Sequence, residues 1–270
     1  MARRIATARA ACAIFGAALA GALINPAFAQ QPAAGPAGTA VVSKACQPGA
    51  TQAAAEAPLP NVAAALARRR PLRILSMGAA PGRIGAHGGT YTAQIERMLQ
   101  SALKVTAIEI VNRGVSGELA ANTALRMKNE VALEEPDLVL WQVGTNDALA
   151  YVPVDEFAEA VKDQLAWLKA HKVDVVLVGL QFAPQMLRDA HYDEIRETLR
   201  RVAAEENIIV IRFFEAMQIL NPPDTEASMP PAEEFERGEA GYDCLSQYVA
   251  RAITLGVFAK GIHPPAQTPK

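Results

Sequence analysis

The 270-residue sequence lacks two features that would place the protein in a membrane or on a nucleic acid. Its N-terminal apolar run, Ala10 to Leu23, is shorter than the roughly 20 residues that a membrane-spanning helix needs. It also lacks a basic stripe, because the formal net charge is −2 and the only run of basic residues is 68–70. Phosphate binding requires clustered Lys and Arg, so the sequence argues against a nucleic-acid partner.

The sequence also lacks the motifs of common cofactor sites. The glycine-rich segment 78–89 reads GAAPGRIGAHGG, and it has neither the Lys and Ser/Thr of a P-loop nor the G-x-G-x-x-G dinucleotide pattern. The acidic residues Glu118, Asp147, Glu233 and Glu236 follow no metal-binding spacing, and we interpret them as solvated loop charge. We therefore expect no cofactor and no metal.

The first 29 residues are typical of a secretory signal peptide. Arginines at the start precede the apolar run, and Ala27-Phe28-Ala29 is a small-residue cleavage site. An uncleaved anchor is the alternative, which the short run disfavours. Cys12 lies within the run without a lipobox, which argues against a lipoprotein. We expect cleavage after Ala29 and a periplasmic or secreted protein.

Composition predicts the remaining organisation of the chain. Residues 30–60 are rich in Ala, Pro, Gly and Gln and read as a linker. Residues 61–260 have the length of one α/β domain, and residues 261–270 read as a tail. Two cysteines remain after signal removal, Cys46 and Cys244, and an oxidising compartment favours a disulfide between them. The alternative is a buried Cys244 and a free Cys46.

Short apolar runs alternate with segments of helical periodicity. The predicted strands are Leu72–Met77, Val105–Val111, Leu138–Val143, Val173–Val178 and Ile208–Phe213. The predicted helices are Tyr91–Leu103, Glu118–Leu133, Val154–His171, Tyr192–Glu206 and Tyr242–Leu255. This alternation predicts an α/β fold, a three-layer α/β/α arrangement around a five-stranded parallel sheet. In such a sheet, ligands bind beyond the carboxyl ends of the strands.

Three consecutive strand ends carry Gly and Asn at related places. Gly78 ends the first strand, the segment NRGVSGE (112–118) follows the second, and VGTNDA (143–148) follows the third. With AGYDCL near the last helix, these motifs resemble the SGNH hydrolases, also called GDSL esterases, over about residues 72–255. The resemblance implies that Gly78, Gly117 and Asn146 bind a ligand oxygen, with the Gly117 N–H and the Asn146 amide as oxyanion donors. The alternative for Asn146 is a loop-fixing role.

The same resemblance exposes two departures. Ala79 and Ala80 stand where the family has aspartate and the nucleophilic serine, and Glu233 and Glu236 stand where it has Asp-x-x-His. Alanine cannot attack a carbonyl, and a carboxylate is a weak base near neutral pH unless it is strongly desolvated. The catalytic positions Ala80, Glu233 and Glu236 are therefore degenerate, and the sequence predicts an impaired enzyme.

Three functions remain open from the sequence. The first is a non-catalytic binder of an acylated carbohydrate, a lipid ester or a cell-wall fragment. The second is an active ester hydrolase with an atypical nucleophile or a water assisted by Glu236. The third is a structural envelope protein without a ligand. We favour the first, because the predicted donors remain while the nucleophile is absent.

Overall fold

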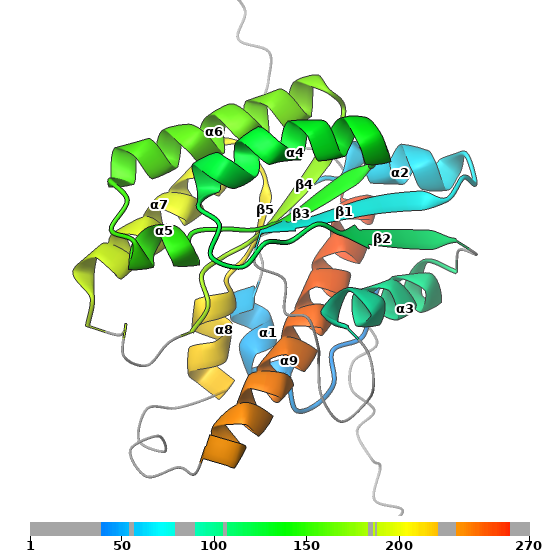
Figure 1. Ribbon diagram of the computed structural model, residues 1–270. Helices are drawn as coiled ribbons and strands as arrows, with labels where there is room; N and C mark the ends of the chain where they lie inside the picture. The colour runs from blue at the N-terminus through cyan, green and yellow to red at the C-terminus, as the bar shows by residue number, and fades with distance from the viewer. Residues whose placement is uncertain are drawn as a thin grey trace, which may run out of the picture. The chain divides into compact units, whose positions relative to one another are not determined.

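Five parallel strands form the central sheet of the protein, as the computed structural model shows (Figure 1). They are β1 (Leu72–Gly78), β2 (Ile108–Asn112), β3 (Leu138–Gln142), β4 (Asp174–Val178) and β5 (Ile209–Ile211). Their order across the sheet is β2-β1-β3-β4-β5. All residues of β3 and β4 are buried, as expected of central strands that are covered on both faces. The predicted fold class is confirmed.

The structure describes residues 39–53, 57–78, 90–104, 107–182, 186, 188–220 and 231–259. For 51–53 and 231–240 it describes the backbone only. The predicted signal peptide, most of the first strand-end loop with Ala79, Ala80 and His87, and the predicted tail lie outside these residues.

Helices cover both faces of the sheet. They are α1 (Gln47–Ala53), α2 (Pro60–Ala67), α3 (Tyr91–Leu103), α4 (Ala120–Glu134), α5 (Thr145–Leu149), α6 (Val154–Ala170), α7 (Ala190–Glu205), α8 (Phe213–Leu220) and α9 (Pro231–Phe258). In Figure 1, α4 and α6 lie on one face, and α3 and α9 lie on the other. None of the helices in the described ranges is both long and apolar enough to cross a membrane.

Alternation along the strands divides the core between the two faces. Leu72 and Ile74 of β1 belong to one buried cluster with side chains of α2, α3 and α9. Leu75 and Met77 belong to the other, with side chains of α4, α6 and α7. This period of two is what a strand buried on both faces requires. The sheet therefore holds its strand ends between two packed helical layers.

The last helix begins earlier than the sequence predicted. The prediction placed its start at Tyr242, whereas α9 starts at Pro231. Proline is well tolerated in the first turn of a helix, and the Ala- and Glu-rich residues that follow favour helix. Glu233 and Glu236 therefore lie on helical backbone instead of on the predicted loop.

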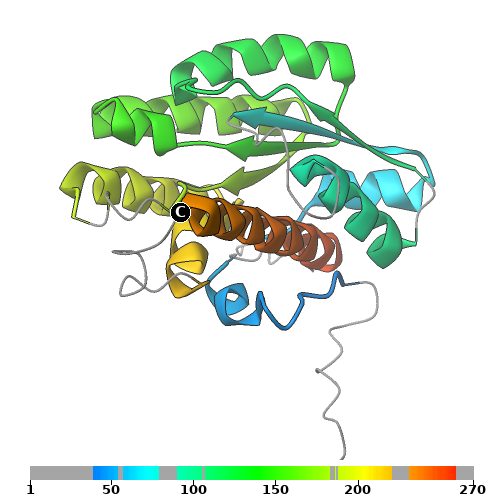
Figure 2. The ribbon, with the colours of Figure 1, turned by 60° about the horizontal axis from the view of Figure 1, so that its bottom comes forward.

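The described part of the predicted linker is packed onto the domain. Ala40, Val42 and Cys46 are buried, and α1 lies in this segment. The Ala40 N–H donates to Thr254 Oγ1 at 3.1 Å, and the Tyr248 hydroxyl donates to the Cys46 carbonyl at 2.6 Å. The linker interpretation is thus wrong for residues 39–53, a segment that lies beside α9 (Figure 2). Ala40, Val42 and Cys46 belong to the same buried cluster as side chains of α9, although the segment shows no apolar periodicity.

The predicted disulfide between Cys46 and Cys244 is present, with the two Cα atoms 5.3 Å apart. It joins the N-terminal segment to α9 across 198 residues of sequence. Cys46 and Cys244 are both buried. The bond therefore fixes the segment that composition alone assigned to a linker.

Candidate functional site

The carboxyl ends of β1, β2 and β3 meet at one edge of the sheet. Ser76 of β1 is in register with Asn112 at the end of β2, and Gly78 is in register with Gln142 at the end of β3. Gly78 has a φ of +84°, and a Cβ at this position would overlap the Gln142 carbonyl oxygen. Glycine is therefore required here, and the chain leaves β1 toward Ala79 in a conformation that other residues rarely adopt.

The loop after β2 presents Gly117 to open space. Gly117 has a φ of +80°, and no atom lies within 4 Å of the place that a Cβ would occupy. The start of the loop is fixed by Asn112, whose Oδ1 accepts from the Gly114 N–H at 2.9 Å. The positive φ and the exposed surroundings suit a backbone group that approaches a ligand.

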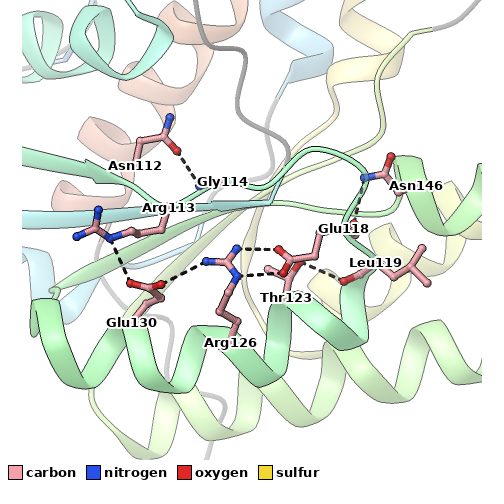
Figure 3. Close-up of polar contacts among 9 residues, drawn as sticks. All are labelled: Asn112, Arg113, Gly114, Glu118, Leu119, Thr123, Arg126, Glu130 and Asn146. Atoms are coloured by element: carbon pink, nitrogen blue, oxygen red, sulfur yellow. Dashed lines mark hydrogen bonds and ion pairs between the residues drawn. The ribbon is translucent and has the colours of Figure 1, made fainter.

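Asn146 lies in the first turn of α5, directly after the end of β3. The preceding Gly144 has a φ of +102° and caps α5. The Asn146 Nδ2 donates to the carbonyl of Glu118 at 3.0 Å, as Figure 3 shows. Since Glu118 follows Gly117 in the chain, this bond brings together the two residues that the resemblance assigned as donors. One Asn146 N–H fixes the loop, and its second N–H remains to donate elsewhere.

An ion pair holds the Gly117 loop against α4. Arg126 donates to both carboxylate oxygens of Glu118, from Nε at 3.0 Å and from Nη2 at 2.7 Å. The Thr123 hydroxyl also donates to Glu118, at 2.9 Å. The hydrogen bonds from Arg126 are the main reason that the pKa of Glu118 is lowered. Two hydrogen bonds from one guanidinium fix the orientation of the Glu118 carboxylate as well as its distance from Arg126. The pair therefore orients the loop that carries Gly117.

The ion pairs continue along α4 toward β2. Arg126 Nη1 lies 3.4 Å from Glu130, and Glu130 also pairs with Arg113 Nε at 3.2 Å. Arg113 pairs with Glu134 at 2.6 Å as well. Figure 3 shows this line of alternating charges from Arg113 to Glu118, apart from Glu134. Both ends of the loop after β2 are thereby attached to the same helix.

Asp147 attaches the third strand end to α4. Its Oδ1 accepts from the Ala120 N–H at 2.9 Å, so it satisfies a backbone donor at the start of α4. Asp147 is only 2% exposed, and burial raises its pKa although backbone N–H groups oppose this shift. The interpretation of Glu118 and Asp147 as solvated charge is wrong, because one is ion-paired and the other caps a helix. In the described residues, no three His, Cys, Asp or Glu side chains are grouped to hold a metal.

A cluster of polar side chains that sequence reasoning missed lies on the α3–α9 side of the sheet. The Tyr242 hydroxyl accepts from Gln181 Nε2 at 2.6 Å, and the Tyr242 ring meets the Tyr91 ring edge-on at 6.3 Å. Burial raises the pKa of Tyr91 and of Tyr242, with Gln142 and Gln181 opposing the shift at Tyr242. We call Tyr91, Gln142, Gln181 and Tyr242 the amide–tyrosine cluster. The sequence feature that could have revealed this cluster is Gln142, a glutamine at a buried position of an otherwise apolar strand.

The structure describes only in part the three positions that were predicted to be degenerate, Ala80, Glu233 and Glu236. Ala80 lies outside the described residues, two residues beyond Gly78. Glu233 and Glu236 lie on the first turns of α9, of which the backbone alone is described. The assignment of Glu233 and Glu236 to the family's Asp and His positions thus stays a prediction. Ser76, weighed as a substitute nucleophile, is 3% exposed within β1, whereas Ser116 is exposed beside Gly117.

A separate cavity of about 300 Å³ lies at the opposite edge of the sheet. It is lined by residues at the amino ends of β4 and β5, including Asp174, whose carboxylate accepts from Asn61 and from the Val62 N–H. These bonds cap the start of α2, so Asp174 has a structural role. The cavity does not belong to the site at the carboxyl ends.

Comparison with known proteins agrees with this geometry. A curated acetylxylan esterase of Geobacillus stearothermophilus is 24% identical over 162 residues, which are 52% of this chain and 72% of that protein. An arylesterase of Vibrio mimicus is 22% identical over 138 residues, 49% of this chain and 68% of that protein. Both resemblances cover about half of this chain.

Solved structures show the same fold. A lipase/acylhydrolase from Enterococcus faecalis superposes with a TM-score of 0.54 at 22% identity, covering 68% of this chain and 95% of that one. An acetyl-xylooligosaccharide esterase from Geobacillus gives 0.51 at 19% identity, covering 72% and 97%. The resemblance to SGNH hydrolases inferred from the strand-end motifs is confirmed. A family model matches residues 45–259, every strand of the sheet included, and the chain belongs to the non-GDSL lipase-like family.

Proposed function

We propose that this protein is an exported SGNH-fold protein that binds an acyl oxygen of a glycan ester without forming a covalent acyl-enzyme. One observation carries the proposal: the Asn146 amide and the Gly117 loop are joined by a direct hydrogen bond, while Ala80 occupies the nucleophile position. The oxygen-binding half of a hydrolase site is built, and the attacking group is missing.

The binding half rests on preorganised donors. Gly117 presents its backbone to open space, and Asn146 keeps one amide hydrogen beyond the bond to Glu118. Arg126 holds Glu118 through two hydrogen bonds, so the loop does not have to order itself when a ligand arrives. Donors fixed in this way stabilise a carbonyl oxygen whether or not it goes on to react.

The absence of covalent chemistry rests on residue types. The family mechanism needs a hydroxyl that attacks and a base that takes its proton. Ala80 offers no hydroxyl, and the ordinary pKa of a glutamate is about two units below that of a histidine. With alanine at position 80 there is no side-chain hydroxyl for such a base to deprotonate, so no covalent acyl-enzyme forms through these positions.

The choice of a glycan ester comes from the relatives. Proteins named acetylxylan esterase and acetyl-xylooligosaccharide esterase are among those that this chain resembles. The predicted signal peptide would deliver the protein to the cell envelope or beyond, where acylated polysaccharides occur. We therefore take an acetylated carbohydrate as the first ligand to test.

A second candidate is an active ester hydrolase with another nucleophile. It is favoured by the names of the curated relatives, which are all esterases. Under this candidate, Ser116 is the exposed hydroxyl nearest in sequence to Gly117. It predicts turnover of simple esters, which the binding proposal does not.

The test uses the purified protein without its first 29 residues. Calorimetric titration with acetylated xylo-oligosaccharides should show binding, and the deacetylated oligosaccharides should bind at least tenfold more weakly. A fluorogenic acetyl ester should not be hydrolysed by the wild type. An Ala80→Ser, Glu236→His double variant should gain turnover, and Ala80→Ser alone is its matched control. Equal binding of both oligosaccharides would refute the acyl-oxygen proposal.

A further inference from the structure

We propose that Tyr91 and Gln142 form a polar subsite that holds a neutral oxygen of the bound glycan beside the acyl site. This subsite rests on the proposed function and extends it from the acyl group to the sugar that carries it. The observations that support it are the placement of both side chains, their burial and, as far as the described residues go, the lack of a hydrogen bond to one donor of each.

Both residues border the segment that contains Ala80. Gln142 ends β3 and is in register with Gly78, the last residue before that segment. Tyr91 begins α3, two residues after the segment ends, and Thr90 caps this helix through a hydrogen bond from the Ala93 N–H. Gln142 of the subsite therefore lies beside Gly78, which is two residues along the chain from the position that aligns with the family's nucleophile.

The Gln142 side chain lies on the same face of the sheet as α3. Leu138 and Leu140, at alternate positions of β3, belong to the buried cluster that contains Tyr91 and side chains of α9. Since side chains alternate along a strand, Gln142 lies on that face too. The Tyr242 ring contacts the Tyr91 ring, and the Gln142 side chain opposes the rise in the Tyr242 pKa that burial causes. The cluster therefore joins β3 to α3 and α9.

Both side chains carry buried donors that find no partner among the described residues. Tyr91 is 3% exposed and Gln142 is 8% exposed. Within the described part of the chain, the Tyr91 hydroxyl and Gln142 Nε2 complete no hydrogen bond. The Gln142 amide lies near the Tyr242 hydroxyl, which accepts from Gln181 Nε2 at 2.6 Å. A buried polar group without a partner destabilises the folded protein, and such groups are rare in native structures. A ligand that accepts from both donors explains why they are there.

The chemistry of the cluster favours a neutral acceptor. Tyr91, Gln142, Gln181 and Tyr242 are all uncharged, and the hydroxyl and amide groups offer N–H and O–H donors. A phosphate or a carboxylate is bound most strongly by Arg or Lys, which the cluster lacks. Two aromatic rings with a few placed donors are typical of a pocket for an uncharged ligand. A sugar hydroxyl or ring oxygen of the glycan meets this requirement.

Two other residues provide matched controls. Tyr248 is also a buried tyrosine, but its hydroxyl donates to the Cys46 carbonyl at 2.6 Å. Gln164 is also a buried glutamine whose amide has no partner in the described ranges, but it lies on α6, which packs on the opposite face of the sheet. Tyr248 thus controls for loss of a hydroxyl, and Gln164 for loss of an unpartnered amide.

The experiment compares Tyr91→Phe and Gln142→Met with Tyr248→Phe and Gln164→Met. In the ligand-free protein, Tyr91→Phe and Gln142→Met should keep or raise the melting temperature, because no hydrogen bond is lost. Tyr248→Phe should lower it. Calorimetric titration with acetylated xylo-oligosaccharides should show roughly fivefold weaker binding for each subsite variant and wild-type affinity for both controls.

The outcomes separate this inference from the proposed function. If the wild type binds and the subsite variants bind equally well, the subsite is refuted and the acyl-oxygen proposal stands. If Tyr91→Phe and Gln142→Met lower the melting temperature as Tyr248→Phe does, the donors have structural partners and the subsite is refuted. If the wild type does not bind the acetylated ligand, the proposed function fails and the subsite fails with it.

Discussion

The strand ends after β2 and β3 differ from the two segments that should supply the nucleophile and the base. Around Gly117 and Asn146, polar side chains fix the loops: Asn146 binds the Glu118 carbonyl, Arg126 binds the Glu118 carboxylate, and Asp147 binds the Ala120 N–H. After β1 and at the start of α9, the resemblance to SGNH hydrolases aligns Ala80 and Glu236 with the family's serine and histidine, and we propose that these residues do not support the family chemistry.

The described contacts that hold the loops of Gly117 and Asn146 come from the loops themselves and from α4. Glu118 and Asp147 hold their loops through α4, and none of these contacts passes through Ala80 or Glu236. An alanine at position 80 therefore removes none of these hydrogen bonds. An oxygen-binding site can persist for a purpose other than acyl transfer.

The largest expected effect is on the anchoring of α9. A Cys46→Ser, Cys244→Ser double variant should lose about 3–5 kcal/mol of unfolding free energy, because the disulfide closes a loop of 198 residues. Urea denaturation of variant and wild type measures this loss. Reductant should destabilise the wild type and leave the double variant unchanged. A loss below about 1 kcal/mol would show that the bond adds little to the packing of α9.

A smaller effect should distinguish the two arginines beside the Gly117 loop. Arg126→Gln should cost about 1–2 kcal/mol, since it leaves the largely buried Glu118 without its two-pronged partner. Arg113→Gln, at a side chain that is 47% exposed, should cost less than about 1 kcal/mol. Equal losses would contradict a specific role for the Arg126–Glu118 pair.

The stabilisation that Arg126 provides should be larger at neutral pH than at acid pH. Because Arg126 lowers the pKa of Glu118 in the folded protein, the pair stabilises the fold above the ordinary carboxyl pKa. That stabilisation is lost as pH falls through the lowered value. Thermal unfolding between pH 7 and pH 3 should thus show the wild type and Arg126→Gln converging at acid pH. A constant gap would contradict this linkage.

Asn146→Ala should have two separable effects. Removing its bond to the Glu118 carbonyl should cost about 1 kcal/mol of unfolding free energy. Binding of an acetylated oligosaccharide should weaken by a further 1–3 kcal/mol, about five- to 150-fold, if the second N–H contacts the acyl oxygen. Asn112→Ala is the control, because Asn112 binds only the nearby Gly114 N–H and is exposed. Stability loss without weaker binding would assign Asn146 to loop fixing alone.

The smallest effect concerns Asp147, whose pKa is raised by burial. A raised folded pKa means that its contribution to stability is full below the ordinary carboxyl pKa and declines as pH rises through the folded value. Asp147→Asn keeps an acceptor for the Ala120 N–H and removes this decline. The stability of Asp147→Asn relative to wild type should grow from pH 3 to pH 7 in thermal unfolding. An opposite slope would contradict the assignment of burial as the dominant cause.

Much of the fold followed from local patterns. Apolar runs predicted each strand within a few residues, and the spacing of Ile95, Leu99 and Leu103 predicted α3 with both its ends. The start of α9 was missed because the segment PAEEFERGEA has helix-forming residues without apolar periodicity. The packed segment 39–53 was missed for a related reason, since small residues such as Ala40 fill contacts that no pattern marks.

The sequence predicted those parts of the site that depend on an unusual backbone conformation. Gly78, Gly117 and Gly144 all adopt positive φ, a requirement that sequence motifs record directly. Pairings such as Arg126 with Glu118 depend on how a loop docks on α4, which sequence spacing does not specify. The Gln142 amide was overlooked because one polar residue in a buried strand does not alter its apolar character.

The absence of covalent chemistry is tested most directly by assaying the purified protein, without its first 29 residues, with a fluorogenic ester and a serine-directed fluorophosphonate probe. Without a hydroxyl at position 80, ester turnover should fall below detection and no serine should be labelled. Binding and oxyanion donors alone leave only about 10³–10⁴-fold acceleration over the uncatalysed reaction in a serine hydrolase that has lost its triad. Robust turnover, or a probe adduct on Ser76 or Ser116, would contradict the loss of the nucleophile and establish the atypical hydrolase instead.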